Sequence, residues 1–195
     1  MSATGHSLYS SYREMLLEHL FTGALMRHLW LRDFGRLEVL KPQVDNSGYD
    51  LALEAHGVLR HIQLKSSHIG AATAGVNIHA ALASKPSGCV VWMRFDQRTL
   101  DFSSFLFLGG EPGDPLPDIS GLKVTKQTKP NAQGVKTERP NLRFVPKAMF
   151  RELWTIDLLI ARLFGDPPVD TGTAATVEIP SVQTMCSPVD FAGPV

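Results

Sequence analysis

The sequence has no net charge, few cysteines and no long apolar run. Its 19 Lys and Arg residues balance 19 Asp and Glu residues, so any electrostatic contact with nucleic acid must be local. Two cysteines, Cys89 and Cys186, are too few for a disulfide framework, which is typical of a reducing compartment. The first residues lack the basic start of a signal peptide, and no apolar run approaches the roughly 20 residues of a membrane span. We therefore expect a cytoplasmic protein.

Three common catalytic patterns are also missing. The 7 histidines show no zinc-ligand spacing with the cysteines, and there is no G-x-S-x-G motif. Gly109–Pro117 is rich in glycine, but its prolines remove N–H donors and no Gly-Lys-Ser/Thr follows, which excludes a phosphate loop. The length of 195 residues predicts one domain over residues 1–165 and a proline-rich tail over residues 166–195.

The clearest pattern in the chain is a β-hairpin signal. Two apolar-rich segments, Tyr49–Ala55 and Val58–Lys65, flank the dipeptide His56-Gly57. A two-residue loop that ends in glycine favours a hairpin, because such a turn needs positive φ. The last residue before the loop then lies opposite the first residue after it, and this fixes the register of the whole hairpin.

This register gives the hairpin one polar and one apolar face. Because side chains alternate with period two, Asp50 lies opposite Gln63 and shares a face with Lys65. The other face is apolar, with Arg60 as its exception, and predicts the core side. One interpretation of the polar face is the wet side of an antiparallel sheet. The other is a metal-dependent phosphodiesterase site, because an acid holds a cation and a lysine stabilises phosphate charge.

The motif of Asp50 followed by Gln63-Leu64-Lys65 on the next strand resembles that of the PD-(D/E)xK nuclease superfamily. In that superfamily, an acid on one strand is followed by (D/E/Q)-x-K on the next. Tyr49 stands here in place of proline, and Gln63 replaces the usual carboxylate. The resemblance implies an α/β, restriction-endonuclease-like fold. We expect a mixed sheet flanked by helices, with a long N-terminal helix and an amphipathic C-terminal helix.

The resemblance also implies a site for Mg²⁺ or Mn²⁺. Asp50 and a glutamate of the preceding helix would bind the metal, Gln63 would position the metal or its water, and the Leu64 carbonyl would be a further ligand. Lys65 would orient the attacking water and offset charge on the phosphate. Asp45 competes with Asp50 as a ligand, although its Asp-Asn-Ser-Gly setting favours a turn. The auxiliary candidates are Ser66, Ser67 and His61.

The spacing of apolar residues from Ser7 to Arg32 predicts a long helix before this hairpin. Ser11 and Glu14 have the spacing of a capping box at its start. Glu18 is the first candidate for the metal-binding glutamate, with Glu14 in reserve, and the alternative for both is a surface carboxylate. The predicted apolar stripe includes Tyr12, Met15, Leu20, Leu25, Met26 and Leu29.

The segments around the hairpin complete an α/β order of elements. We expect strands at Leu37–Val44, Cys89–Phe95 and Phe102–Leu108, a short helix at Val76–Ala83, and a C-terminal helix at Pro146–Phe164.

A local excess of basic residues lies between Lys123 and Arg143, where the sole acid is Glu138. One interpretation is a surface that contacts the phosphate backbone, and the alternative is a solvated loop. The candidate nucleic-acid-binding residues are Lys123, Lys126, Lys129, Lys136, Arg139 and Arg143.

These features together predict a metal-dependent nuclease that hydrolyses phosphodiester bonds, in DNA rather than RNA. Nucleic acid is the expected partner, and a homodimer is left open. The alternative is a catalytically inactive protein of the same fold that binds nucleic acid or serves as an interaction subunit of a defence or repair complex. Gln63 in place of a carboxylate favours this alternative.

Overall fold

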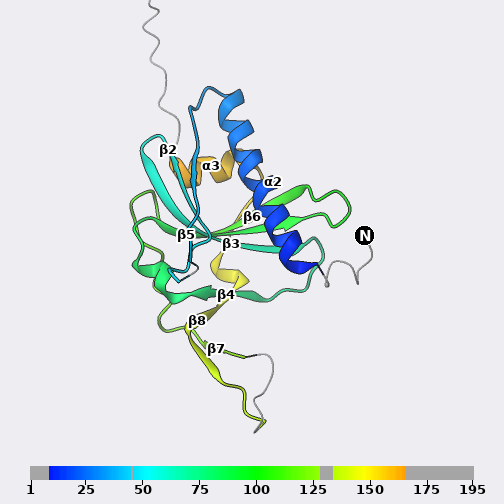
Figure 1. Cartoon of the computed structure of the whole chain (residues 1–195), viewed down its shortest axis with the longest axis vertical. Helices are drawn as coiled ribbons and strands as arrows, with labels where there is room; N and C mark the ends of the chain where they lie inside the picture. The colour runs from blue at the N-terminus through cyan, green and yellow to red at the C-terminus, as the bar shows by residue number, and fades with distance from the viewer. Residues whose placement is uncertain (1–8, 45, 128–133, 166–195) are drawn as a thin grey trace, which may run out of the picture.

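The computed structural model describes residues 9–44, 46–127 and 134–165, and it has a mixed α/β fold (Figure 1). The elements are helix α2 (Ser10–Leu31), strands β1 (Glu38–Leu40), β2 (Leu51–Ala55), β3 (Val58–His68) and β4 (Gly75–His79), 3-10 helix η1 (Ala80–Ser84), strands β5 (Gly88–Phe95), β6 (Phe102–Gly109), β7 (Val124–Lys126) and β8 (Glu138–Pro146), 3-10 helix η2 (Lys147–Met149), strand β9 (Arg151–Leu153) and helix α3 (Ile156–Phe164). The predicted tail, Asp45 and Lys129 lie outside the described residues.

Two sheets form the framework. The main sheet has six strands in the order β1-β2-β3-β5-β6-β9, and within it β3 and β5 are parallel while the other neighbours are antiparallel. The second sheet has three antiparallel strands in the order β4-β8-β7, and β7 and β8 extend away from the main sheet (Figure 1). The expected mixed α/β class is confirmed.

The main sheet is covered on both faces. On one face, the buried side chains of α2 and α3 pack with those of β2, β3, β5 and β6 in one apolar cluster. On the other face, Trp92, Leu106 and their neighbours pack against the second sheet and η1 in a second cluster. The expectation of a sheet flanked by helices therefore holds for one face, whereas strands cover the other.

The hairpin register is the one predicted from the sequence. Ala55 lies opposite Val58, and the ladder runs to Leu51 opposite Ile62. His56 and Gly57 both have positive φ, at 52° and 72°, as a tight two-residue turn requires. From Leu51 to Ile62 the alternation is also as predicted, and the apolar side chains of this stretch lie in the cluster shared with α2. Beyond it the prediction is wrong, because Tyr49 packs against His61 and the second cluster, and the predicted pairing of Asp50 with Gln63 is not formed.

The long N-terminal helix is confirmed, and Leu25 and Leu29 of its predicted stripe are buried, but the rest of the stripe and the predicted cap are wrong. Its buried side chains are Leu17, Phe21, Leu25 and Leu29, spaced four residues apart on one face. Tyr12, Met15, Leu20 and Met26 are exposed instead. The stripe was misplaced because this helix carries apolar residues all round, so periodicity alone does not select a face. The N-cap is Tyr9, with no side-chain cap, so Glu14 is not a capping-box residue.

Three other predicted segments needed correction. The helix expected at Val76–Ala83 is strand β4 followed by η1, and the strand expected at Leu37–Val44 is limited to β1. The C-terminal helix begins at Ile156 rather than Pro146, because the Thr155 hydroxyl caps its start and the preceding residues form η2 and β9. Its buried residues on one face confirm the amphipathic character. In the described part of the chain, no helix has the length and apolarity needed to cross a membrane.

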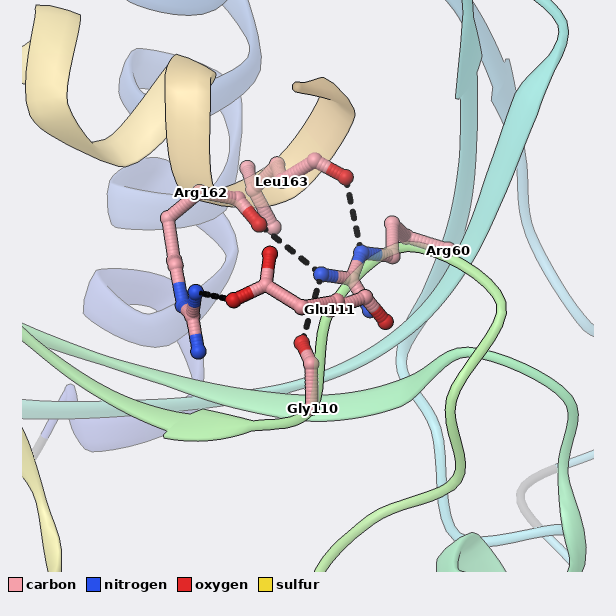
Figure 2. Close-up of polar contacts among 5 residues, drawn as sticks. All are labelled: Arg60, Gly110, Glu111, Arg162 and Leu163. Atoms are coloured by element: carbon pink, nitrogen blue, oxygen red, sulfur yellow. Dashed lines mark hydrogen bonds and ion pairs between the residues drawn. The ribbon is translucent and has the colours of Figure 1, made fainter. Parts of the chain in front are cut away.

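Arg60 is fully buried and ties the hairpin to the end of α3 (Figure 2). Its guanidinium donates to the carbonyl oxygens of Leu163 at 2.7 Å and Arg162 at 2.8 Å. It also donates to the carbonyls of Gly110 at 3.0 Å and Glu111 at 3.2 Å. Burial lowers the pKa of the Arg60 guanidinium. The last turn of a helix leaves carbonyls without partners, so Arg60 serves as a C-terminal cap from another element.

Candidate functional site

The candidate site lies along the part of β3 that extends past β2. Strand β3 is 11 residues long, and its ladder with β2 ends at Ile62. The backbone N–H of Leu64 therefore lies beyond the ladder, and it donates to Asp50 Oδ2 at 2.6 Å. Because the N–H and C=O of a residue in a strand project to the same edge, the Leu64 carbonyl lies on this edge as well.

A pocket of about 430 Å³ opens at this edge of β3. It brings together Asp50 and Lys65 from the hairpin with Glu14 and Glu18 from α2, residues that are far apart in the sequence. Leu64 and Ser66, two other predicted site residues, also line it. The remaining lining residues are Met15, Lys41 and Met93.

Glu18 is the more enclosed of the two helix glutamates. Its side chain is 16 % exposed and forms an ion pair with Lys41, which follows β1, whereas Glu14 is exposed. Glu18 lies one turn before the buried Phe21, so it borders the sheet side of the helix. The sequence analysis missed Lys41, and no short-range pattern marks it, because the contact depends on how β1 passes α2.

The position of Asp50 depends on the turn before it. Gly48 has a φ of +79°, which favours glycine, and a Cβ there would lie 2.9 Å from the Cβ of His79. Asp50 N donates to the Ile62 carbonyl at 2.9 Å, out of step with the regular ladder. This irregular step turns the Asp50 carboxylate toward Leu64 N.

Gln63 lies on the other side of β3 from the carboxylates. It is 7 % exposed, and its Oε1 accepts the backbone N–H of His79 at 3.2 Å, which links it to the end of β4. It lines a second pocket of about 410 Å³ between the two sheets. Lys65 lines both pockets, and the other residues of the second pocket are Asn77, His79, Arg139 and Leu142.

The three auxiliary candidates, Ser66, Ser67 and His61, have different surroundings. Ser66 lines the carboxylate pocket, whereas Ser67 Oγ accepts from Trp92 Nε1 at 2.9 Å. His61 packs edge-on against Tyr49, with ring centroids 4.8 Å apart, and its Nδ1 is 2.8 Å from the Pro86 carbonyl oxygen.

The basic stretch forms much of the second sheet. Lys126 pairs with Glu138 at 3.7 Å, and the Arg143 guanidinium donates to nearby backbone carbonyls, including that of Pro140 at 2.6 Å. Lys123 and Lys126 line a hollow beside Asn77. Arg139 lines the second pocket, and Lys136 is exposed. Lys126 lies in the three-residue β7 and Arg139 and Arg143 lie in the nine-residue β8, whereas Lys123 and Lys136 lie just outside these strands.

The carboxylate pocket contains oxygen atoms of the type that hard divalent cations bind, but its three carboxylates do not form a preassembled metal cluster. Among residues 9–44, 46–127 and 134–165, no three His, Cys, Asp or Glu side chains are grouped closely enough to hold a metal ion. The pocket combines the Asp50 and Glu18 carboxylates with the Leu64 edge of β3. Mg²⁺ is often held by one or two carboxylates together with substrate phosphates rather than by a complete set of protein ligands. Burial raises the pKa of the Cys89 thiol to about 12, which makes it a packing residue rather than a nucleophile.

No family model matches the sequence. No curated protein matches it either. Among solved structures, a match is found to "The structure of a bacterial homing endonuclease: I-Ssp6803I", with 21% sequence identity and a TM-score of 0.25. The match covers 59% of this chain and 79% of that chain. A likeness this slight carries no argument about activity, which has to come from the site itself.

Proposed function

We propose that the chain is a metal-dependent nuclease that hydrolyses phosphodiester bonds, in DNA rather than RNA, and that it is a divergent member of the PD-(D/E)xK superfamily. The observation that supports this is the carboxylate pocket, where Asp50 and Lys65 meet Glu18 from a distant helix. An acid pair beside a lysine, at the open edge of a strand, is the arrangement that the resemblance implies.

Asp50, Glu18 and the Leu64 carbonyl would hold the cation, with Glu14 as a further carboxylate at the rim. A divalent cation there would neutralise phosphate charge and activate water. The Asp50 carboxylate is fixed for this role by the Leu64 N–H. Lys41 already pairs with Glu18, so the protein keeps the helix carboxylate balanced by a positive charge before any metal binds.

Lys65 would orient the attacking water and stabilise the phosphate. It belongs to β3, which is paired with β5 along this stretch, so its backbone is held by a sheet rather than by a loop. A donor fixed in this way stabilises the charge that develops in the transition state without reorganising first.

Metal binding should stabilise the fold through Asp50. Mn²⁺ at a hundredfold excess over its dissociation constant should raise the free energy of unfolding by about 2.7 kcal/mol, because the cation binds only the folded state. Thermal melting with and without Mn²⁺ measures this. Asp50→Asn keeps an acceptor for the Leu64 N–H but removes the charge, so the metal-dependent rise should disappear.

Glu54→Gln is the matched control for this experiment, since Glu54 is an exposed carboxylate of β2 in the same hairpin. It should retain the full metal-dependent rise. If millimolar Mn²⁺ leaves the melting temperature of the wild-type protein unchanged, the metal site is excluded and the second candidate function remains.

The second candidate is a catalytically inactive protein that binds nucleic acid or joins a defence or repair complex. The observation in its favour is Gln63, whose amide oxygen is engaged by the β4 backbone and which lies outside the carboxylate pocket. It predicts nucleic-acid binding without metal-dependent stabilisation and without cleavage.

A further inference from the structure

The second pocket differs in charge from the carboxylate pocket, although Lys65 lines both. The carboxylate pocket contains Glu14, Glu18 and Asp50. The second pocket contains Lys65 and Arg139, and none of the residues that line it is acidic. Lys65 is therefore the residue that the lining of the acidic pocket shares with that of the cationic one.

The neutral side chains of the second pocket present donors. Gln63 Oε1 accepts the His79 N–H, and Asn77 Oδ1 accepts the Thr125 hydroxyl at 2.8 Å, so the amide NH₂ groups of both side chains are left to donate. His79 Nδ1 accepts the Ala81 N–H at 3.2 Å, which places the proton of the neutral ring on Nε2.

A pocket lined by guanidinium, amide and imidazole N–H groups matches a ligand that only accepts hydrogen bonds. Phosphate oxygens are such acceptors, and arginine binds them with its planar fork. A further hollow of about 270 Å³ shares His79, Arg139 and Leu142 with the pocket, so the hollowed surface beside Arg139 continues along β8.

We infer that the second pocket binds a backbone phosphate that neighbours the one at the carboxylate pocket. The ligand is then a polynucleotide with at least two phosphates rather than a phosphomonoester. This inference rests on the proposed function for the identity of the first site. The two pockets share Lys65 in their linings, so neighbouring phosphates of one strand are the ligand that would fill them together.

The inference also assigns a role to Gln63. A carboxylate at this position would keep an acceptor for the His79 N–H but would add a negative charge to a phosphate-binding pocket. Gln63 is thus a positioning residue that holds β4 while leaving the pocket cationic. If Gln63 were instead a weakened metal ligand, a carboxylate at this position should strengthen metal binding.

The decisive experiment measures binding of a fluorescent duplex DNA by anisotropy, in EDTA so that no cleavage occurs. Arg139→Gln should weaken affinity about tenfold, because a charge-assisted contact is lost. The slope of log affinity against log salt should become shallower by about one, as for one lost phosphate contact. Arg36→Gln, which removes an exposed charge beyond the other end of α2, should change neither value appreciably.

The Gln63→Glu variant tests a second residue that lines the same pocket. It should weaken DNA binding without strengthening Mn²⁺-dependent stabilisation, and circular dichroism checks that it folds. Stronger Mn²⁺ stabilisation with unchanged DNA affinity would overturn the inference in favour of a metal role for Gln63. Unchanged affinity in Arg139→Gln, or no DNA binding by the wild-type protein, would also overturn it.

Two further results distinguish a polynucleotide from a free phosphate ion, and this inference from the nuclease proposal. Inorganic phosphate that stabilises the wild-type protein as much as the DNA does would assign the pocket to a free phosphate ion and overturn the polynucleotide inference. DNA that binds through Arg139 but is not cut with Mn²⁺ would refute the nuclease proposal and leave the phosphate pocket standing.

Discussion

Replacing Lys65 by alanine should reduce Mn²⁺-dependent cleavage of DNA by at least about a hundredfold, the usual cost of removing one fixed donor from a charged transition state. Lys65 lines the pocket that holds Asp50 and Glu18, and its strand is fixed by β5. The measurement is initial cleavage rate at saturating DNA, so that the loss of one cation from the binding surface does not enter the result.

Lys85→Ala is the matched control for the cleavage assay. The Lys85 ammonium lies 5.5 Å from the centre of the Tyr49 ring and lines neither pocket, so its removal takes away the same charge without touching the site. It should cleave at close to the wild-type rate. Cleavage that survives in Lys65→Ala would place the chemistry elsewhere, and a wild-type protein inert on single-stranded, duplex and branched substrates would refute the nuclease proposal.

The hairpin was predictable because its information is local. A turn that needs positive φ at His56 and Gly57 fixes the register, and period-two alternation then fixes which side chains share a face. The same reasoning extended the ladder one step too far, to Asp50 opposite Gln63. The irregular hydrogen bond from Asp50 to Ile62 depends on the Gly48 turn and its packing against His79, a contact between distant segments.

The second sheet was not predictable, because its pairings are long-range. Strand β4 pairs with β8 across a large separation in the sequence, and Val76–Ala83, which covers most of β4 and η1, was therefore predicted as a short helix. As a consequence, the polar face of the hairpin was expected to be wet or catalytic, whereas part of it is covered by another sheet. Gln63 therefore lies between two sheets rather than beside Asp50.

Predicting the carboxylate pocket required both local and long-range information. Glu18 was identified from its place beside the buried residues of the helix, and the structure places it in the same pocket as Asp50. Lys41 gave no signal, since a lysine at the end of a short strand is ordinary. The candidate site was thus recovered as a set of motif residues, while the charge that balances Glu18 appeared only in three dimensions.

Replacing Arg60 by methionine should lower the free energy of unfolding by about 3 kcal/mol, since it leaves one buried and three partly buried carbonyls without this donor. Methionine keeps much of the length and apolar volume, so the loss reports hydrogen bonds and charge rather than a cavity. Two of the four carbonyls belong to the last turn of α3, and the other two to the loop after β6 (Figure 2).

Urea denaturation measures this loss, and the melting temperature should fall by about 6 to 12 °C for a domain of this size. Arg36→Met removes an exposed arginine and should change the free energy of unfolding by less than about 0.5 kcal/mol. Arg60→Lys keeps a charge but cannot reach both helix and loop with a planar fork, so its stability should fall between those of the wild type and Arg60→Met. A loss below about 1 kcal/mol in Arg60→Met would mean that water or a rearranged α3 end satisfies these carbonyls, and that Arg60 does not hold the helix against the hairpin.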